Sequence, residues 1–164
     1  MQMPISNVQC AVAHIPSSLF IMTAAHEEQA YGVLVRWVQR CSEQPPMVVI
    51  ALEKGQRIDP LIRDSRAFVL CQISAADRFL ARKFQEEAAR SSEDDPFVCL
   101  STHRSPSGSP IIDRAMCWLD CELARTVELD SEFRLYVGQI HHGGVLNKGE
   151  PAICFGDDDN HPGC

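Results

Sequence analysis

Short strand-like segments separated by turns are the sequence feature that most constrains how this chain folds. Apolar runs bounded by Gly, Pro and polar clusters predict strands over 18–23, 33–39, 47–52, 67–73, 118–127 and 133–142. Their order shows no alternation of strand and long helix, which a parallel sheet would require. Six or seven short strands with one or two short helices therefore predict a mainly β fold, a closed antiparallel barrel.

The clearest strand pattern lies between Val33 and Arg40. Side chains of a strand point alternately to its two faces, so the segment divides into two sets. One face carries Val33, Val35 and Trp37, and the other carries Leu34, Arg36, Val38 and Arg40. We therefore expect one apolar face and one face with two cations. Pro45 and Pro46 exclude a central strand at that point, and 47–52 is typical of a buried strand.

Two short helices are predicted between the strands. Asp59 followed by Pro60 is typical of an N-cap and a first helical position, and predicts a helix over 60–64. A second helix over 76–89 is indicated by a capping box and by apolar residues four apart, at Ser74, Asp77, Leu80, Phe84 and Ala88. Residues 103–110 are rich in Ser, Pro and Gly and are predicted to form a loop.

The length and the charge of the chain limit its domain organisation and its possible partners. A chain of 164 residues with 45% hydrophobic residues fits one domain, expected over 1–150 and followed by a flexible acidic tail over 151–164. The formal charge of -7 would repel a phosphate backbone, so nucleic acid is not an expected partner. No apolar run approaches the ~20 residues that a membrane helix needs, and the first residues do not form a signal segment. We expect a soluble, cytoplasmic protein that does not bind a membrane.

The eight cysteines are expected to be reduced thiols rather than a disulfide framework. Such frameworks belong to short secreted chains with small cores. Cys71, Cys99 and Cys121 lie within apolar runs, where cysteine behaves as a small buried hydrophobe. The aromatic residues predicted to fill the core are Trp37, Phe68, Phe79 and Phe84.

Two groups of Cys and His residues have weak metal-site spacing. Cys117 and Cys121 share a face of a predicted strand but lack further ligands. The second group lies towards the C-terminus and consists of His141, His142, Cys154, His161 and Cys164. Its spacing fits no compact zinc pattern. Buried thiols and a mobile tail explain the two groups better, so no metal site is predicted.

Four segments in a fixed order resemble the flavin reductase-like family of FMN-binding split β-barrels. The likeness runs from about Ile15 to Gly138 and covers most of the chain. Its parts are Ile15-Pro16-Ser17-Ser18 through Ala24, Gly32 through Ser42 with Pro45-Pro46, Pro110 through Glu122, and Leu135-Tyr136-Val137-Gly138. Each part alone is a weak match, whereas four in the right order are specific for the fold.

The resemblance implies a flavoprotein with a split β-barrel fold. Members of the family bind FMN, usually at a dimer interface, and many pass hydride from NADH or NADPH to flavin. The resemblance thus implies FMN, or FAD, as cofactor, NAD(P)H as electron donor, and a homodimer. Because flavin itself supplies the redox chemistry, no catalytic residue is identified in the chain.

The same resemblance places candidate cofactor-binding residues on two segments. The first segment would lie along the isoalloxazine ring of the flavin and comprises Val33, Leu34, Val35, Arg36 and Trp37. The second would approach the ribityl phosphate, and its candidates are Ala51, Leu52, Lys54 and Arg57. Phe84, in the second predicted helix, would border the ring.

Three basic side chains in these segments could bind an anion. Arg36 offers a planar fork of donors that suits the FMN phosphate or the N1 side of the flavin. A surface arginine paired with a carboxylate is an equal alternative for this residue. Lys54 and Arg57 bracket Gly55 in a turn that could hold a phosphate, although cations in loops are more often only solvated.

The chain also departs from the family pattern, and the departures support further hypotheses. Val35 and Arg36 replace a small pair, Cys71 stands where relatives have Asn, and Leu129-Asp130-Ser131-Glu132 replaces a Gly-Asp-His turn. A second hypothesis is therefore a non-catalytic flavin-binding barrel dimer without reductase activity. A third is a barrel that binds another planar cofactor such as haem, with a histidine ligand drawn from His26, His103 and His141.

Overall fold

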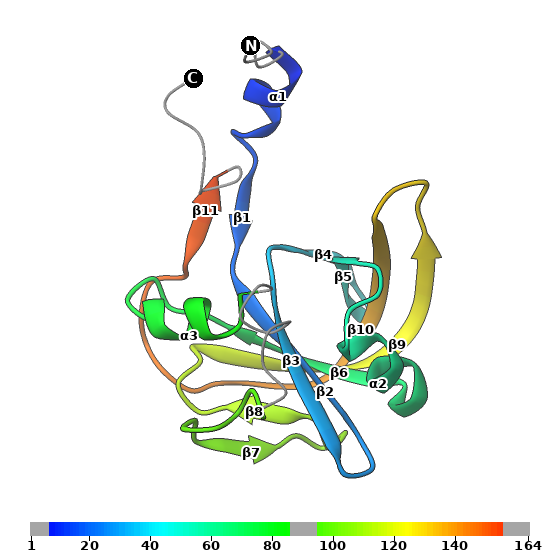
Figure 1. Ribbon diagram of the computed structural model, residues 1–164, viewed down its shortest axis with the longest axis vertical. Helices are drawn as coiled ribbons and strands as arrows, with labels where there is room; N and C mark the ends of the chain where they lie inside the picture. The colour runs from blue at the N-terminus through cyan, green and yellow to red at the C-terminus, as the bar shows by residue number, and fades with distance from the viewer. Residues whose placement is uncertain (1–6, 86–94, 156–164) are drawn as a thin grey trace.

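Seven antiparallel strands form the main sheet of the computed structural model, which describes residues 7–85 and 95–155 (Figure 1). Their order across the sheet is β3-β2-β6-β9-β10-β5-β4. The strands are β2 (Phe20–His26), β3 (Gln29–Val35), β4 (Trp37–Glu43), β5 (Pro46–Glu53), β6 (Ala67–Gln72), β9 (Cys117–Glu128) and β10 (Phe133–Val145). Each predicted strand segment lies mainly in this sheet, with Ser18, Leu19, Arg36 and Ile73 outside it, so the mainly β fold and the split barrel are confirmed.

The barrel closes where β3 passes into β4. These two strands are the opposite edges of the sheet, yet only Arg36 separates them in the sequence. The sheet must therefore curl until its two edges meet at this point. We call residues 35–37 the seam.

The seam shifts the alternation of side chains by one residue. Val33 and Val35 are each 2% exposed and belong to the cluster inside the barrel. Trp37, expected on the same face, is 51% exposed, whereas Val38 packs against the interior cluster. The prediction of one continuous strand over 33–39 is therefore wrong at Arg36, because the break between β3 and β4 moves later side chains to the other face.

Shorter elements flank the barrel. The helices are α1 (Asn7–Val12), α2 (Ile58–Ser65) and α3 (Arg78–Lys83). Two small sheets pair β1 (Pro16–Ser18) with β11 (Ile153–Phe155), and β7 (Thr102–Arg104) with β8 (Pro110–Ile112). In Figure 1, α1, β1 and β11 extend away from the barrel, while α2 and α3 lie beside it.

Several of these short elements differ from the sequence-based expectation. Helix α1 has no counterpart among the predicted helices. Helix α3 ends at Lys83 rather than at residue 89, because Phe84 leaves the helix and is fully buried, and residues 86–89 lie outside the described part of the chain. The loop expected over 103–110 is a hairpin, since Ser105 N donates to Ser109 O at 2.9 Å around Gly108, whose φ is 95°.

The helix caps also differ from the predicted ones. Asp59 lies in the first turn of α2 rather than at its N-cap, which is Arg57. For α3 the N-cap is Asp77, whose carboxylate accepts from Leu80 N at 3.2 Å. Ser74 instead accepts from Ala76 N, so the predicted capping box is wrong in its first residue.

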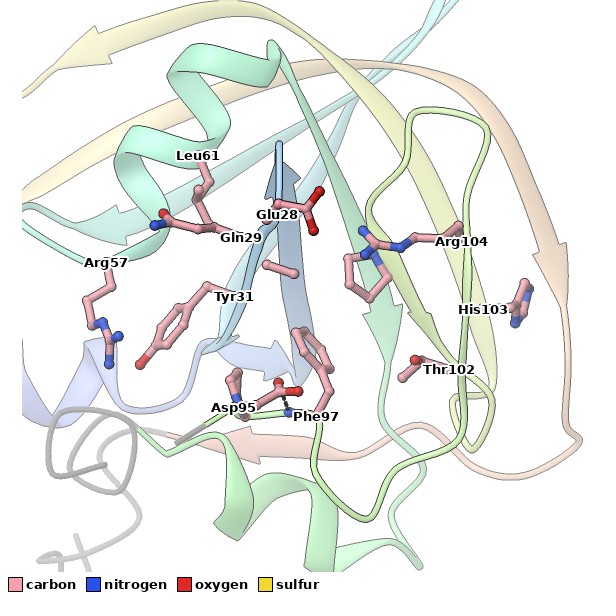
Figure 2. Close-up of a pocket in the computed structure, with 13 residues that line it drawn as sticks. Glu28, Gln29, Tyr31, Arg57, Leu61, Asp95, Phe97, Thr102, His103 and Arg104 are labelled. Carbon is pink, nitrogen blue, oxygen red and sulfur yellow. Dashed lines mark hydrogen bonds between the residues drawn. The ribbon is translucent and has the colours of Figure 1, made fainter. Parts of the chain in front are cut away.

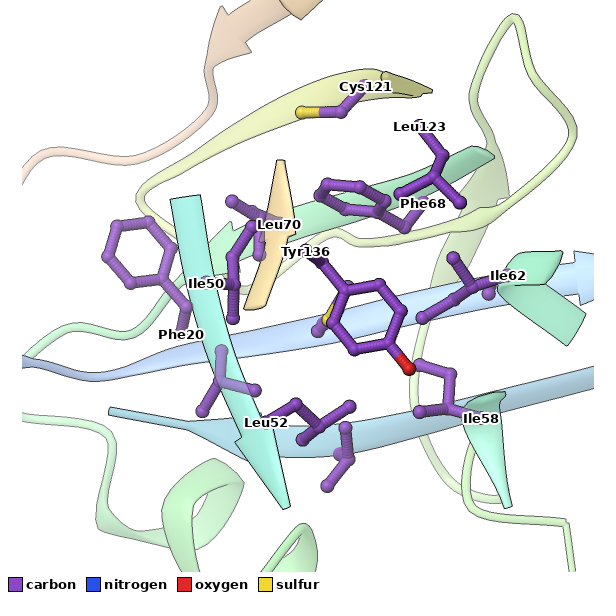
Figure 3. Close-up of a cluster of buried hydrophobic side chains, with 14 of the residues drawn as sticks. Phe20, Ile50, Leu52, Ile58, Ile62, Phe68, Leu70, Cys121, Leu123 and Tyr136 are labelled. Carbon is purple, nitrogen blue, oxygen red and sulfur yellow. The ribbon is translucent and has the colours of Figure 1, made fainter. Parts of the chain in front are cut away.

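Two apolar clusters lie on the two sides of the sheet. The inner cluster fills the barrel, and its large side chains include Phe20, Ile50, Ile58, Ile62, Phe68, Leu70 and Tyr136 (Figure 3). The outer cluster packs α3 and β8 against the other side of the sheet and includes Ile21, Val69, Leu80, Phe84 and Ile111. Strands β2 and β6 contribute to both clusters, so nearly all of their residues are buried.

The four aromatic residues predicted to be core residues divide into two pairs. Phe68 and Phe84 are fully buried, so the prediction is confirmed for them. Trp37 is 51% exposed and Phe79 is 48% exposed, so it is wrong for these two. Trp37 faces outward because of the shift at the seam, and Phe79 lies on the solvent side of α3 next to the buried Leu80.

The seven described cysteines are all free thiols. Cys71 and Cys121 are buried as predicted, and desolvation raises the pKa of each thiol from 9.0 to about 12. Cys99 is exposed instead, because it lies in a surface turn with a φ of 65° rather than in a strand. The two buried thiols are therefore packing residues.

The segment expected to be a tail over 151–164 begins with ordered structure. Residues 153–155 form β11, in which Cys154 lies opposite Ser17 of β1 and is 5% exposed. Antiparallel pairing with β1 explains this order, which the acidic composition of the last residues did not indicate. Residues 156–164 lie outside the described part of the chain.

Candidate functional site

Three of the candidate cofactor-binding residues point into the barrel. Val33, Val35 and Leu52 are between 2% and 4% exposed and belong to the inner cluster. Their side chains fill the core, so only their backbone atoms could contact a bound molecule. The assignment of these three residues to a flavin site stays a prediction, and it concerns their backbone atoms rather than their side chains.

Four other candidates are accessible near the seam. Leu34, Arg36 and Ala51 are half-buried, and the Trp37 ring is half-exposed. Trp37 lies directly opposite Ala51 in the pairing of β4 with β5. The structure therefore brings the first predicted segment, 33–37, next to Ala51 of the second on the outer surface of the barrel.

An aromatic pair marks this surface. The centroids of the Trp37 and Phe133 rings are 4.8 Å apart, with the ring planes tilted by 56°. Phe133 begins β10 and lies opposite Glu53 of β5. The sequence did not identify Phe133 as a site residue, because only the β5–β10 register places it beside Trp37.

The free edge of β3 is packed against the end of α3. Leu34 N donates to Phe84 O at 3.1 Å rather than to β2. A Cβ atom added at Gly32 would lie 2.8 Å from Cε1 of Phe84, so this glycine allows the ring to approach the strand. Phe84 thus lies near the segment for which the resemblance suggested a bordering role.

Lys54 is bound to the turn between β9 and β10. Its ammonium group donates to Leu129 O at 2.8 Å and to Ser131 O at 2.9 Å, and it lies 3.4 Å from Oε2 of Glu128. Its backbone N–H donates to Glu132 O at 2.8 Å. Because an ammonium group has three N–H donors, the oxygen atoms of Leu129, Ser131 and Glu128 account for all of the donors of the Lys54 side chain.

The turn after β5 is held by a carboxylate. Asp59 Oδ2 accepts from Gly55 N at 3.1 Å, and Gly55 has a φ of 80° that favours glycine. The Tyr136 hydroxyl donates to the other oxygen of Asp59, and Nη1 of Arg134 lies 3.7 Å from Oδ2. Desolvation, and then the bond to Asp59, raise the pKa of Tyr136 to about 12.

Arg57 lies away from the seam, beside a separate pocket. Figure 2 shows its guanidinium next to the ring of Tyr31, with its central carbon 4.7 Å from the ring centroid. This pocket has a volume of about 600 Å³, and Phe97, Thr102 and Arg104 also line it. The structure therefore does not bring Arg57 together with Arg36 and Trp37.

The histidines considered as haem ligands are spread over different elements. His26 ends β2, with Nε2 3.9 Å from a Glu27 carboxylate oxygen. His103 of β7 bonds through Nδ1 to Asp113, and His141 of β10 bonds to Glu122 at 2.9 Å. A second bond, from Ser101 Oγ, is the larger cause that lowers the pKa of Asp113, followed by the bond from His103. Carboxylates thus already bind two of the three rings.

No three His, Cys, Asp or Glu side chains within residues 7–85 and 95–155 are grouped so that they could hold a metal ion. Cys117 donates to Oε1 of Gln72 at 3.4 Å, and desolvation raises its pKa. His161 and Cys164 lie outside the described residues.

The chemistry of the seam fits a flat ring that carries an anionic group. Trp37 and Phe133 offer aromatic surface for stacking. Arg36 offers planar donors for an anion. The side chains of Val33 and Val35 face inward, so they do not occupy the outer surface of the seam.

Comparison with known proteins identifies related chains. The model of the flavin reductase like domain matches residues 12–160. The chain is 28% identical to diflavin flavoprotein A 1 of Synechocystis sp. over 141 residues, which are 85% of this chain but only 24% of that protein. It is also 28% identical to the NADPH-flavin oxidoreductase of Streptomyces viridifaciens, over 86% of this chain and 72% of that one. The chain thus spans about a quarter of the diflavin relative.

Solved structures show the same fold. The NADH:FAD oxidoreductase of Streptomyces globisporus superposes with a TM-score of 0.79 over 94% of this chain and 92% of its own, at 19% identity. The flavin reductase of styrene monooxygenase from Pseudomonas putida S12 gives a TM-score of 0.76 over 92% and 93% of the two chains, at 22% identity. At these identities the likeness establishes the architecture.

Proposed function

Because this chain belongs to the family of flavin reductase-like domains, we propose that it is a flavin reductase that binds FMN at the seam and takes hydride from NADH or NADPH. The observation that supports this proposal is the pairing of Trp37 with Ala51, which joins the two segments that the resemblance assigns to flavin. FAD is the alternative cofactor, since one relative of the same fold is named for it. The names of relatives include both NADH and NADPH as donors.

Bound flavin would accept hydride from the nicotinamide and pass electrons on, and the protein's part is to bind and orient it. The backbone of β3 and the ring of Trp37 would hold the flat ring against the barrel. The inner cluster behind Val33 and Val35 makes that surface rigid, because these side chains are fully packed. Arg36, Ala51 and the ends of β4 and β5 complete the predicted site. Leu52 and Lys54 would support it from inside the barrel and from the adjoining turn.

The absorbance spectrum of the purified protein tests the proposal. We expect either a yellow protein or quenching of FMN fluorescence on titration, followed by bleaching of the flavin band when NADH or NADPH is added without oxygen. A colourless protein that leaves FMN fluorescence unchanged would contradict it.

The proposal includes a homodimer in the cytoplasm. Apolar side chains exposed on the extension formed by α1, β1 and β11, namely Val8, Val12, Ile15, Ile153 and Phe155, suit a subunit contact. The seven described cysteines are free, which suits a reducing compartment. No helix within residues 7–85 and 95–155 is long and apolar enough to cross a membrane. Light scattering of the purified protein would measure the subunit number.

One observation favours a flavin-binding barrel without reductase activity. Cys71, which stands where the family carries Asn, is fully buried in the outer cluster. A thiol in that position offers only a weak donor to a ligand. Tight FMN binding without oxidation of NADH or NADPH would favour this second function over the first.

A further inference from the structure

We infer that Arg36 recognises the phosphate group of the bound flavin and so distinguishes FMN from riboflavin. This inference rests on the proposed function and adds the residue that selects among flavins. It departs from the expectation that the turn containing Lys54 and Arg57 would hold the phosphate. Four basic residues lie between Val33 and Arg57, and their contacts decide among them.

Lys54 is the basic residue nearest in sequence to the expected phosphate turn, but its ammonium group is already bound. Two carbonyl oxygens and the carboxylate of Glu128 surround it at 2.8 to 3.4 Å. A phosphate would have to displace these oxygens, which hold the β9–β10 turn in place. Lys54 therefore positions the turn rather than binding an anion.

The turn itself presents a carboxylate where the anion would bind. The backbone N–H of Gly55 donates to Asp59, which also accepts from Tyr136 and lies next to Arg134. A phosphate at this turn would meet the negative charge of Asp59 and would compete with it for the same N–H group. The Asp59 carboxylate thus already takes the backbone N–H group that a phosphate would need at this turn.

The remaining two arginines are also engaged or distant. Arg40 pairs with Glu43 at 3.0 Å and is 69% exposed. Arg57 lies over the Tyr31 ring at the separate pocket. Each of these two guanidinium groups thus already has a partner within the protein.

Arg36 is the basic residue that fits. It is half-buried at the seam, and no other described residue makes a hydrogen bond, ion pair or ring contact with its side chain. It precedes Trp37, which is paired with Ala51, so Arg36 lies at the junction of the two predicted segments. The protein has a formal charge of -7, so an anionic ligand needs a local cation of this kind. Oxidised flavin carries no charge on its ring, and the phosphate is the group such a cation would attract.

Titration of the protein with FMN and with riboflavin tests the inference, with flavin fluorescence as the readout. Wild-type protein should prefer FMN. Arg36→Gln should weaken FMN binding about tenfold or more, because a hydrogen bond between charged groups is lost, while riboflavin affinity stays unchanged. Arg36→Lys should give an intermediate FMN affinity, since an ammonium keeps the charge but not the planar fork.

Two controls match the change in charge. Arg40→Gln removes a cation from β4, and Lys54→Gln removes the cation at the end of β5. Both variants should keep the wild-type ratio of FMN affinity to riboflavin affinity. Raising the ionic strength should reduce the preference of the wild type and leave Arg36→Gln unaffected.

Three results would overturn the inference while leaving the proposed function intact. In the first, Arg36→Gln keeps the preference for FMN. In the second, Lys54→Gln loses it instead. In the third, Arg36→Gln binds both flavins more tightly, which would mean that the arginine occupies the place of the ring. If the wild type binds neither flavin, the proposed function fails, and the inference fails with it.

Discussion

The ammonium group of Lys54 donates to the carbonyl oxygen of Ser131 at 2.9 Å. This bond joins the end of β5 to the β9–β10 turn, 77 residues later in the chain. The resemblance to the flavin reductase-like family implies a Gly-Asp-His sequence at the position of this turn. The Lys54 side chain, which the sequence suggests for phosphate binding, therefore connects two loops beside the seam through hydrogen bonds.

Replacing Lys54 by Ala should loosen this turn. We expect faster amide hydrogen exchange at residues 129–132 and a loss of about 1 kcal/mol in the free energy of unfolding, since the bonds are to carbonyl groups at a partly exposed site. Arg40→Ala, which breaks an exposed pair with Glu43, should change neither quantity. Equal exchange rates in Lys54→Ala and the wild type would show that the hydrogen bonds of Lys54 do not stabilise the β9–β10 turn.

Trp37 should contribute stacking surface to the flavin site. Trp37→Ala should weaken FMN binding about tenfold, because aromatic contact and buried area are lost together. Phe79→Ala is the matched control, since Phe79 is 48% exposed against 51% for Trp37 but lies on α3. Fluorescence titration compares the two variants, and an equal loss in both would argue against stacking at the seam.

Tyr136 should make the stability of the barrel sensitive to alkali. Its pKa is raised from 10.0 to about 12, so its contribution is fully present below pH 10 and is lost as the pH rises through about 12. Tyr136→Phe should cost about 1 to 2 kcal/mol at neutral pH, because Asp59 loses a donor. Urea unfolding at a series of pH values should show this cost shrinking above pH 10, and a constant cost would contradict the assignment.

Asp113 should make the stability of the fold sensitive to acid rather than to alkali. Its pKa is lowered from 3.8 by Ser101 first and His103 second, so its contribution is present above pH 3.8 and is lost as the pH falls through its lower folded value. Asp113→Asn should cost no more than about 1 kcal/mol at neutral pH, because the carboxylate is 40% exposed. Urea unfolding at acid pH should show the two proteins converging. Asp130→Asn, the same change in an exposed turn, should have no effect at either pH.

The sequence was sufficient for the strands and for the class of fold. The sequences of β2 and β6 are apolar because both faces of these strands are buried, and β5 alternates because its inner face is buried. Such local patterns of apolar residues indicate which positions are buried, and so they predict the strands. The order of the four family motifs then selected the split barrel, which the structure confirms.

The seam could not be predicted from local patterns. Alternation from Val33 to Trp37 looks continuous in the sequence, but the chain crosses from one sheet edge to the other at Arg36 and reverses its faces there. Such a shift depends on how the whole sheet closes. The exposure of Trp37 and its contact with Phe133 follow from this closure.

The partners of the charged side chains could not be predicted from the sequence either. Lys54 and Asp59 each bind groups more than seventy residues away, on the β9–β10 hairpin. Which cation remains available for a ligand depends on these long-range pairs. Arg36 therefore emerges as the candidate anion-binding residue only when the contacts of Lys54, Arg40 and Arg57 are known.

The most direct test of the flavin site is to map FMN binding onto the backbone by NMR. Titration of labelled protein should shift the amide signals of residues 34–37 and of Ala51, with smaller changes elsewhere. Shifts confined to the residues of the separate pocket, such as Tyr31, Phe97 and Thr102, or no shifts at all, would contradict the placement of flavin at the seam.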